Sequence, residues 1–252
     1  MLIDTHAHLY AKQFDEDRAA MIDRAIEKGV EKFYLPNIDS ESIEGMLQLE
    51  KDYPDRCFPM MGLHPCSVKE NFEEELKIVE QWLGKRKFSA VGEIGTDLYW
   101  DKTFYEQQKK AFIRQVEWAI DLDLPIIIHC RESMDLTIDL VQPYKGKLRG
   151  IFHCFGGSLE QAQKIMDLDF LMGIGGVLTF KKAKLDEVIK DIPLEYLVLE
   201  TDSPYLAPKP FRGKRNESAY VRIVAEKMAE AKSCSLEEIA KVTSKNSDNL
   251  FK

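Results

Sequence analysis

The segment Ile3-Asp4-Thr5-His6-Ala7-His8 ends the first apolar run of the chain with two histidines in a His-x-His pattern. Residues two apart on a strand point to the same side, so both imidazoles can face one shared site. An open, doubly wound sheet would instead be expected to carry a glycine-rich phosphate-binding turn at this place. The histidine pair therefore favours a closed barrel, in which the ends of parallel strands converge on one mouth.

Seven more short apolar runs follow, and their continuous hydrophobicity is typical of parallel strands covered on both faces. The eight runs span residues 2–5, 32–36, 57–63, 89–94, 125–129, 150–155, 170–175 and 196–201. Amphipathic, helix-like stretches separate them at residues 17–28, 42–52, 72–85, 104–121 and 134–141. Eight such alternations without a break in composition predict an α/β fold, a (β/α)8 TIM barrel, in a single domain spanning residues 1–252.

The later helices are marked by their starts. Ser158 with Gln161 and Ser235 with Glu238 have the spacing of capping boxes, in which the two side chains satisfy the first free backbone groups of a helix. Residues 241–252 are expected to complete a final helix packed on the barrel exterior.

Composition limits the possible partners and locations. The formal net charge of −8 argues against a broad nucleic-acid-binding surface, although it leaves room for a local basic patch. The chain starts without a secretory leader pattern, and no apolar run approaches the roughly 20 residues that span a bilayer, so no membrane association is expected. The five cysteines form no CxxC pair, which predicts a reducing, cytoplasmic setting.

All five histidines of the chain fall at the ends of predicted strands, and two carboxylates end strands in the same way. These strand-end residues are His6, His8, His64, Glu93, His129, His153 and Asp202. Parallel strands of a barrel deliver their last side chains to one mouth, where imidazoles and carboxylates can bind metal together. A single strand-end acid is more often a helix cap, and His64 before Pro65 could simply belong to a rigid turn. The joint pattern predicts a metal-dependent hydrolase.

Six segments together resemble the TatD-related metal-dependent deoxyribonucleases, a branch of the amidohydrolase-like barrels. They are Ile3-Asp4-Thr5-His6-Ala7-His8, Gly62-Leu63-His64-Pro65, Val91-Gly92-Glu93-Ile94-Gly95, Ile128-His129-Cys130-Arg131, Phe152-His153-Cys154-Phe155-Gly156-Gly157 and Glu200-Thr201-Asp202-Ser203-Pro204-Tyr205-Leu206-Ala207-Pro208. The chain departs from the family pattern at Thr96-Asp97-Leu98-Tyr99, where Leu-Asp and two aromatics are usual. It also departs at Asn216-Glu217-Ser218, which lacks a proline. Both departures bear on substrate preference more than on metal binding.

The resemblance implies a binuclear metal site. One metal would be held by His6, His8, Glu93 and Asp202. The other would be held by Glu93, His129 and His153, with His64 beside it. A carboxylate has two oxygens, so Glu93 can bridge two cations about 3.5–4 Å apart. Imidazole and carboxylate ligands without thiolate suit Zn, Mn, Ni or Co, and the oxygen-rich bridge also suits Mg.

The implied activity is that of a deoxyribonuclease that cleaves DNA phosphodiester bonds exonucleolytically with a metal-activated water. The DNA partner would be single-stranded or present an exposed end, and no obligate protein partner is apparent. Asp202 is the candidate general base, and His64 would bind a phosphate oxygen or protonate the leaving group. With the bridging Glu93, these residues form the predicted catalytic set.

Basic residues near the strand ends are the candidate contacts to substrate phosphates. They are Arg131 after the fifth strand, and Lys209, Arg212, Lys214 and Arg215 in the loop after Asp202. A solvated loop would explain the same charges. Five aromatics could either stack bases or pack: Tyr99, Trp100, Phe155, Tyr205 and Phe211.

Three other functions remain open. The same binuclear site could hydrolyse a small-molecule amide, lactone or ester, although many such barrels bridge their metals with a carboxylated lysine, where this chain has Glu93. It could also hydrolyse an aminoacyl ester on tRNA, which would release an amino acid. A metal-bound scaffold without catalysis is the third alternative, disfavoured because the ligand set leaves positions for water.

Overall fold

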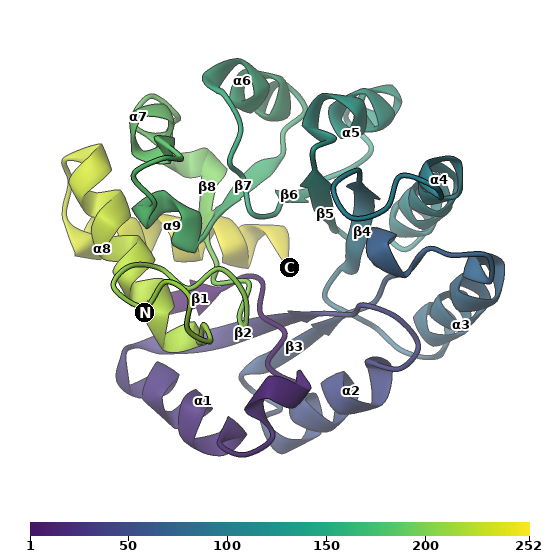
Figure 1. Ribbon diagram of the computed structural model, residues 1–252, viewed down its shortest axis with the longest axis horizontal. Coiled ribbons are helices and arrows are strands. Elements are labelled where there is room, and N and C mark those ends of the chain that lie inside the picture. The colour runs from purple at the N-terminus through teal and green to yellow at the C-terminus, as the bar shows by residue number, and fades with distance from the viewer.

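Eight parallel strands form a ring, and the connecting helices lie around its outside (Figure 1). The computed structural model describes residues 1–252. The strands are β1 (Leu2–Asp4), β2 (Val30–Pro36), β3 (Cys57–Met60), β4 (Val91–Asp97), β5 (Ile126–Arg131), β6 (Gly150–Phe152), β7 (Leu171–Ile174) and β8 (Leu197–Leu199). The helices are α1 (Arg18–Glu27), α2 (Ile43–Asp52), α3 (Phe72–Lys85), α4 (Tyr105–Asp121), α5 (Met134–Val141), α6 (Leu159–Asp167), α7 (Leu185–Ile189), α8 (Val221–Lys232) and α9 (Leu236–Leu250). The predicted (β/α)8 TIM barrel is confirmed.

The ring is closed at two seams. Regular pairing gives one sheet in the order β1-β2-β3 and a second in the order β4 to β8. Parallel bridges join Met61 to Val91 at one seam and Ala7 to Ser203 at the other. At the second seam the Thr5 backbone N–H donates to the Leu199 carbonyl at 3.0 Å. The first and last strands therefore meet, as a barrel requires.

The floor of the barrel is a separate apolar layer. It contains one buried side chain from each of seven strands or their flanks, Ile3, Tyr34, Met60, Ala90, Ile127, Ile151 and Val198. Leu250, at the end of α9, completes this layer, and the Phe251 ring stacks on Tyr34 with centroids 3.7 Å apart. The expected final helix is thus found: α9 packs against α8, β1 and β8, and its end closes the barrel from below.

The predicted helix starts are found with one difference. Ser158 and Gln161 form the complete capping box at the start of α6. Ser235 accepts the backbone N–H of Glu238 at 3.1 Å, but the Glu238 side chain does not accept the Ser235 backbone N–H in return. The second box is thus half formed. The Ser235 hydroxyl caps the helix without the second bond.

An ion-pair network ties α1 to the loop after β8. Asp17 accepts hydrogen bonds from the guanidinium groups of Arg24 at 3.0 Å and Arg215 at 2.7 and 2.8 Å. Arg24 also donates to Glu217 at 2.7 Å. Hydrogen bonds from Arg215 and Arg24 lower the pKa of Asp17 to about 2.

Replacing Asp17 with Asn should lower the free energy of unfolding by no more than about 1 kcal/mol near neutral pH, because solvent screens this half-exposed pair. The folded-state pKa lies below the ordinary value of 3.8, so the contribution is complete above about pH 4 and disappears as pH falls toward 2. Urea titrations of both proteins at several pH values measure it. Asp23→Asn, exposed on the same helix, is the control. A difference that stays constant with pH would contradict the prediction.

Candidate metal centre

The carboxylate of Glu93 is the geometric centre of the site. It is 2% exposed and is contacted by all five histidines of the chain. Oε2 lies 3.0 Å from His6 Nε2 and 3.5 Å from His8 Nε2. Oε1 lies 3.4 Å from His64 Nε2, 2.8 Å from His129 Nδ1 and 3.4 Å from His153 Nε2. The two oxygens thus face two different groups of nitrogens.

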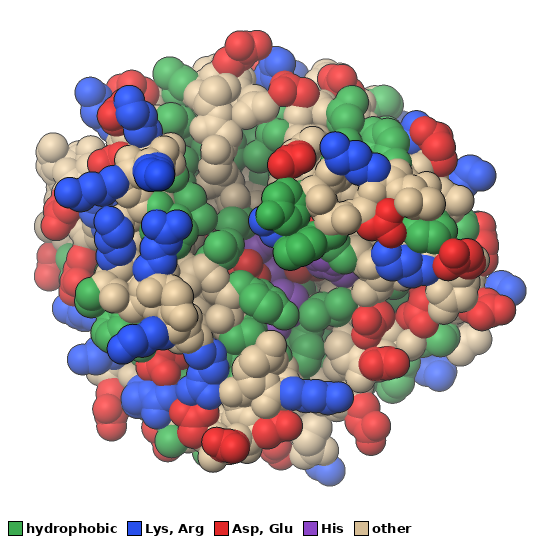
Figure 2. Space-filling model, in the orientation of Figure 1, with side chains coloured by type: hydrophobic (Ala, Val, Ile, Leu, Met, Phe, Trp, Pro, Cys, Tyr) green, Lys and Arg blue, Asp and Glu red, His purple; other side chains and the backbone are tan.

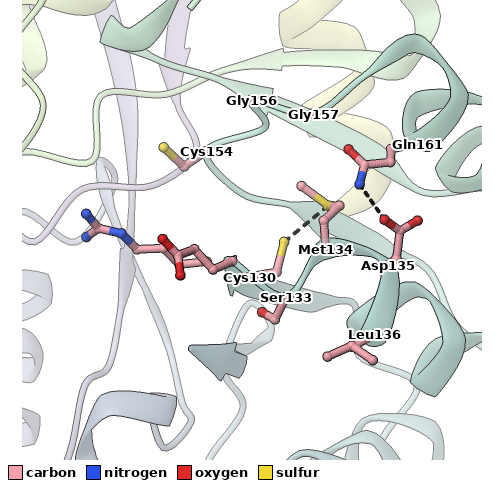
Figure 3. Close-up of a pocket in the computed structure, with 11 residues that line it drawn as sticks. Cys130, Ser133, Met134, Asp135, Leu136, Cys154, Gly156, Gly157 and Gln161 are labelled. Atoms are coloured by element: carbon pink, nitrogen blue, oxygen red, sulfur yellow. Dashed lines mark hydrogen bonds between the residues drawn. The ribbon is translucent and has the colours of Figure 1, made fainter. Parts of the chain in front are cut away.

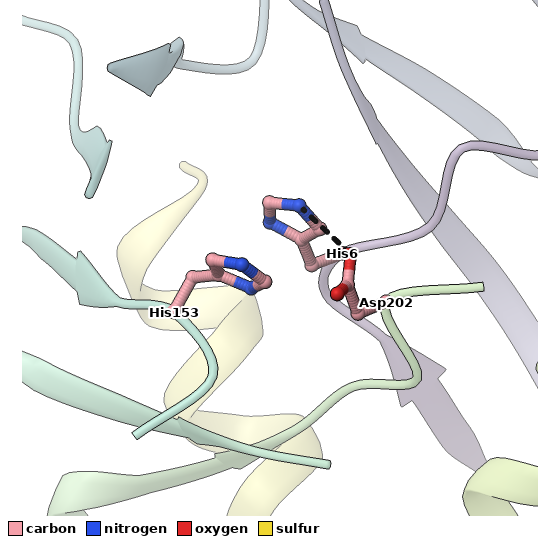
Figure 4. Close-up of side chains that lie close together, drawn as sticks. All are labelled: His6, His153 and Asp202. Atoms are coloured by element: carbon pink, nitrogen blue, oxygen red, sulfur yellow. Dashed lines mark ion pairs between the residues drawn. The ribbon is translucent and has the colours of Figure 1, made fainter. Parts of the chain in front are cut away.

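Asp202 adds a second carboxylate on the side of His6 and His8. Its Oδ1 lies 3.8 Å from His6 Nε2 and 3.7 Å from His8 Nε2. Figure 4 shows Asp202 and the His6 and His153 rings converging from three separate segments, and the two rings stack with centroids 3.7 Å apart. The side chain of Asp202 is 15% exposed, so it lies at the boundary between the buried cluster and solvent.

The structure brings all six predicted ligands, and His64, into three overlapping groups whose ligand atoms lie within 4.8 Å of one another. These groups are His6 with His8 and Glu93, His6 with His153 and Asp202, and His64 with Glu93 and His129. His153 thus reaches toward both sides of Glu93. The division of the ligands between two metals stays a prediction.

The strand that carries Glu93 pairs with the strand that carries His129. The sequence suggested that Glu93 ends its strand, but β4 continues to Asp97. Within β4, Gly95 pairs with His129 of β5. A Cβ at Gly95 would lie 1.9 Å from the His129 carbonyl oxygen, and its φ is +145°. Only glycine allows this approach, which keeps the two strands close enough for the Glu93 and His129 side chains to meet.

Neighbouring side chains determine which ring nitrogen carries the proton in two of the histidines. The Tyr10 hydroxyl donates to the Pro36 carbonyl and therefore accepts from His8 Nδ1, 2.9 Å away. Glu200 Oε1 accepts from His153 Nδ1 at 3.0 Å. In both rings the remaining Nε2 faces Glu93, where it can present a lone pair to a bound metal. This is the arrangement of metal-binding histidines, whose other ring nitrogen donates to a carboxylate or similar acceptor.

His129 and His64 are oriented differently. His129 Nε2 donates to Asp97 Oδ2 at 2.9 Å, which turns Nδ1 toward Glu93. His64 Nδ1 accepts the backbone N–H of Cys66 at 3.0 Å, so its proton lies on the Nε2 that faces Glu93. His129 therefore offers the centre a lone pair, whereas His64 offers it a hydrogen-bond donor.

The electrostatics of the cluster favour a cation. Burial opposes the ionisation of Glu93, yet its interactions with the surrounding imidazoles hold its pKa well below the usual range. Burial would lower the pKa of His153, but the carboxylates of Glu200 and Glu93 raise it to about 10. Burial raises the pKa of Asp202 to about 6. Buried carboxylates need positive charge beside them, and a divalent metal supplies it without protonating the imidazoles.

Two buried polar atoms have no hydrogen-bond partner, His6 Nδ1 and Glu200 Oε2. Polar atoms buried in this way are rare in folded proteins and concentrate where a site is incomplete without another group. Together with the donor set around Glu93, they show that the residues present fit a metal site.

Three residues of this centre were missed by sequence reasoning: Tyr10, Asp97 and Glu200. Tyr10 continues the two-residue alternation of His6 and His8, and Glu200 precedes Asp202 by two, so the same spacing could have identified both. In the sequence, Asp97 stands out only as part of a departure from the family pattern. Its role depends on β4 extending past Glu93, which the apolar run 89–94 does not indicate.

The predicted phosphate contacts lie around the mouth in different settings. Lys209, Arg212, Lys214 and Arg131 are exposed, and Arg212 lies 4.4 Å above the Phe180 ring. Arg215 is already paired with Asp17. Figure 2 shows histidine side chains at the bottom of a central hollow, with lysine and arginine side chains gathered on the side of α7 and α8.

A pocket of about 510 Å³ opens beside the cluster, between the start of α5 and the loop after β6 (Figure 3). Cys130, Arg131, Met134, Cys154 and Gln161 line it, among others. A pocket of this volume is in the range that holds a small organic ligand. Two residues of its lining, Cys130 and Cys154, directly follow the candidate ligands His129 and His153.

The five candidate aromatics separate by burial. Phe155 is 1% exposed and belongs to the core, and the Phe211 ring stacks on Tyr220 with centroids 4.3 Å apart. Tyr99, Trp100 and Tyr205 are 48%, 68% and 47% exposed. Packing thus explains the first two, and only the exposed rings have a face free for a ligand.

A parallel barrel whose mouth holds a buried cluster of histidines and carboxylates defines the class of metal-dependent hydrolases. The family described as TatD related DNase matches residues 3–252. The chain belongs to this family.

Known relatives match over their full lengths. The Bacillus subtilis (strain 168) metal-dependent hydrolase YabD is 40% identical, over 100% of this chain and 99% of the relative. The Pantoea ananatis protein named 3'-5' ssDNA/RNA exonuclease TatD is 28% identical, over 99% of each chain. The crystal structure of YjjV, a TatD homologue from Escherichia coli K12, superposes with a TM-score of 0.94 at 32% identity, covering 99% of this chain and 97% of that one.

No helix of the structure has both the length and the apolar character that crossing a membrane would require.

Replacing Glu200 with Gln should weaken metal binding roughly 10- to 100-fold, because the acceptor that orients His153 becomes an amide of lower basicity. Titration of the metal-stripped protein with Zn²⁺ by calorimetry measures this change. Glu195→Gln, an exposed position near the same strand, is the matched control. Thermal unfolding in chelator shows whether the variant is folded. Unchanged affinity in a folded variant would remove Glu200 from the metal centre.

Proposed function

We propose that the protein hydrolyses phosphodiester bonds of DNA, starting from an exposed or single-stranded end. The observation that carries this proposal is the division of the Glu93 contacts, with one oxygen facing His6 and His8 and the other facing His64, His129 and His153. A carboxylate used in this way suits two cations, and two-metal sites are common in nucleases and phosphatases. The name of the Pantoea ananatis relative supports the same reaction class.

The resemblance to the TatD-related enzymes suggests which residues would hold two metals. His6, His8, Glu93 and Asp202 would hold one, and Glu93, His129 and His153 the other. Zn, Mn, Ni, Co and Mg are all compatible with this set of nitrogens and oxygens. Divalent metals bound there would lower the pKa of a bound water and place positive charge beside the phosphate.

Asp202 is suited to accept the proton of the attacking water. It lies at the solvent boundary of the cluster, and burial raises the pKa of its carboxyl to about 6, closer to the range in which a base works at neutral pH. His64 is suited to the opposite task, because its Nε2–H points to the centre and can donate to a phosphate oxygen or to the leaving group.

The exposed basic residues would position the strand. Arg131, Lys209, Arg212 and Lys214 are available for phosphate contacts on a molecule whose total charge is −8. Arg215 would first have to leave Asp17, so its contribution is to hold the loop in which the others lie. Contacts of this kind position a nucleic acid without reading its sequence.

Metal-stripped protein should regain the release of mononucleotides from end-labelled single-stranded DNA when Mg, Mn or Zn is restored. Glu93→Ala, purified in parallel, excludes a contaminating nuclease and should stay inactive. Absence of cleavage with metal confirmed bound would overturn the proposal. Release of an amino acid from aminoacyl-tRNA, or hydrolysis of a lactone or amide, would then identify the alternative reaction at the same site.

Replacing Asp202 with Asn should lower the turnover number by about 10²- to 10⁴-fold, the usual contribution of a general base, while much of the metal stays bound. Turnover is measured on the DNA substrate and metal content by elemental analysis of the same sample. Asp191→Asn, an exposed position before β8, controls for charge removal. Full activity of the Asp202 variant would show that another group accepts the proton.

A further inference from the structure

Two exposed aromatic rings and one arginine lie together beside the metal centre. Tyr99 and Trp100 are 48% and 68% exposed, and their rings meet edge to face with centroids 4.8 Å apart. The Arg131 guanidinium lies 3.8 Å from the Tyr99 ring centroid and 5.3 Å from that of Trp100. We call these three side chains the aromatic platform. Trp100 is the most exposed large apolar side chain of the molecule.

The aromatic platform is held in place by a carboxylate that also orients a candidate metal ligand. Asp97 Oδ1 accepts the backbone N–H groups of Tyr99 at 2.9 Å and Trp100 at 3.0 Å. Asp97 Oδ2 accepts from His129 Nε2 at 2.9 Å. Strand pairing also sets Asp97 of β4 opposite Arg131 of β5. The rings and the metal centre therefore share one rigid support.

Within the aromatic platform, Arg131 also faces open space. Its side chain is exposed, pairs with no carboxylate and lines the pocket of about 510 Å³. One group thus has a cationic plane stacked on an aromatic ring and a free edge toward the pocket. Aromatic faces next to a free cation are the combination that binds single-stranded nucleic acid, where bases stack and phosphates meet positive charge.

We propose that the aromatic platform stacks a nucleobase of the strand whose phosphate lies over Glu93, a step that rests on the proposed function. Trp100 supplies the free face, and Arg131 meets an adjacent phosphate. Every base has a π-face, so this subsite accepts any base. A base paired within a duplex has its faces covered by its neighbours. The subsite therefore selects single-stranded or frayed ends.

Tryptophan fluorescence tests the stacking directly, without depending on catalysis. Metal-loaded protein is titrated with a short phosphorothioate-linked oligothymidylate, which resists hydrolysis. Binding should quench the fluorescence of the wild type. Trp100→Phe should keep most of the affinity, measured by anisotropy of a labelled strand, and lose most of the quenching, because Trp82 and Trp118 lie elsewhere on α3 and α4.

Trp100→Ala should weaken strand binding roughly 5- to 150-fold, the range measured when a stacking side chain is removed. Leu122→Ala, an exposed apolar position just beyond the end of α4, should bind like the wild type. A series of strands with a single abasic nucleotide locates the stacked base. At one position the abasic strand should bind the wild type and the Trp100→Ala variant equally.

The outcomes separate the two proposals. Equal binding of intact strands by the wild type and Trp100→Ala, or an abasic penalty that is the same in both, would overturn the stacking subsite even if DNA is hydrolysed. Quenching and abasic dependence without hydrolysis of unmodified DNA would leave the subsite standing and overturn the proposed nuclease activity.

Discussion

One buried carboxylate surrounded by five imidazoles governs this structure. Glu93 lies inside the barrel mouth, and the histidines that contact it come from four other strands or their ends. Closure of the ring brings these residues, distant in sequence, around one side chain. The two seams that close the ring, at Met61 with Val91 and Ala7 with Ser203, are therefore conditions for the site as much as for the fold.

The same constraint explains where polar groups are buried. Tyr10, Asp97 and Glu200 each hold the outer nitrogen of one histidine, so the inner nitrogen keeps its lone pair for the centre. Burying acidic groups in this way costs stability unless a cation compensates them. The buried acidic groups lie at one end of the barrel. The apolar layer that includes Ile3 and Leu250 stabilises the other end.

The barrel and the candidate ligands could be predicted from the sequence because both produce local sequence patterns. Short apolar runs give the strands, and His6 with His8 gives a shared side by simple alternation. Sequence reasoning did not reach Asp97, because the end of β4 is decided by pairing with β5 and not by its own hydrophobicity. Nor did it separate Arg215 from the other basic residues, since its partner Asp17 is almost two hundred residues away in sequence. Long-range pairing of this kind is invisible in a local pattern.

The helix that seals the barrel floor gives the site a single entrance. Leu250 and Phe251 fill the space below the strands, so nothing can pass along the barrel axis from one face of the molecule to the other. A polymer that reaches Glu93 must arrive and depart through the same opening. The site is therefore a cleft that is closed at its base, and not a channel through the molecule. A linear ligand can enter there by a terminus, or bent inward at a loop, but it cannot be threaded through.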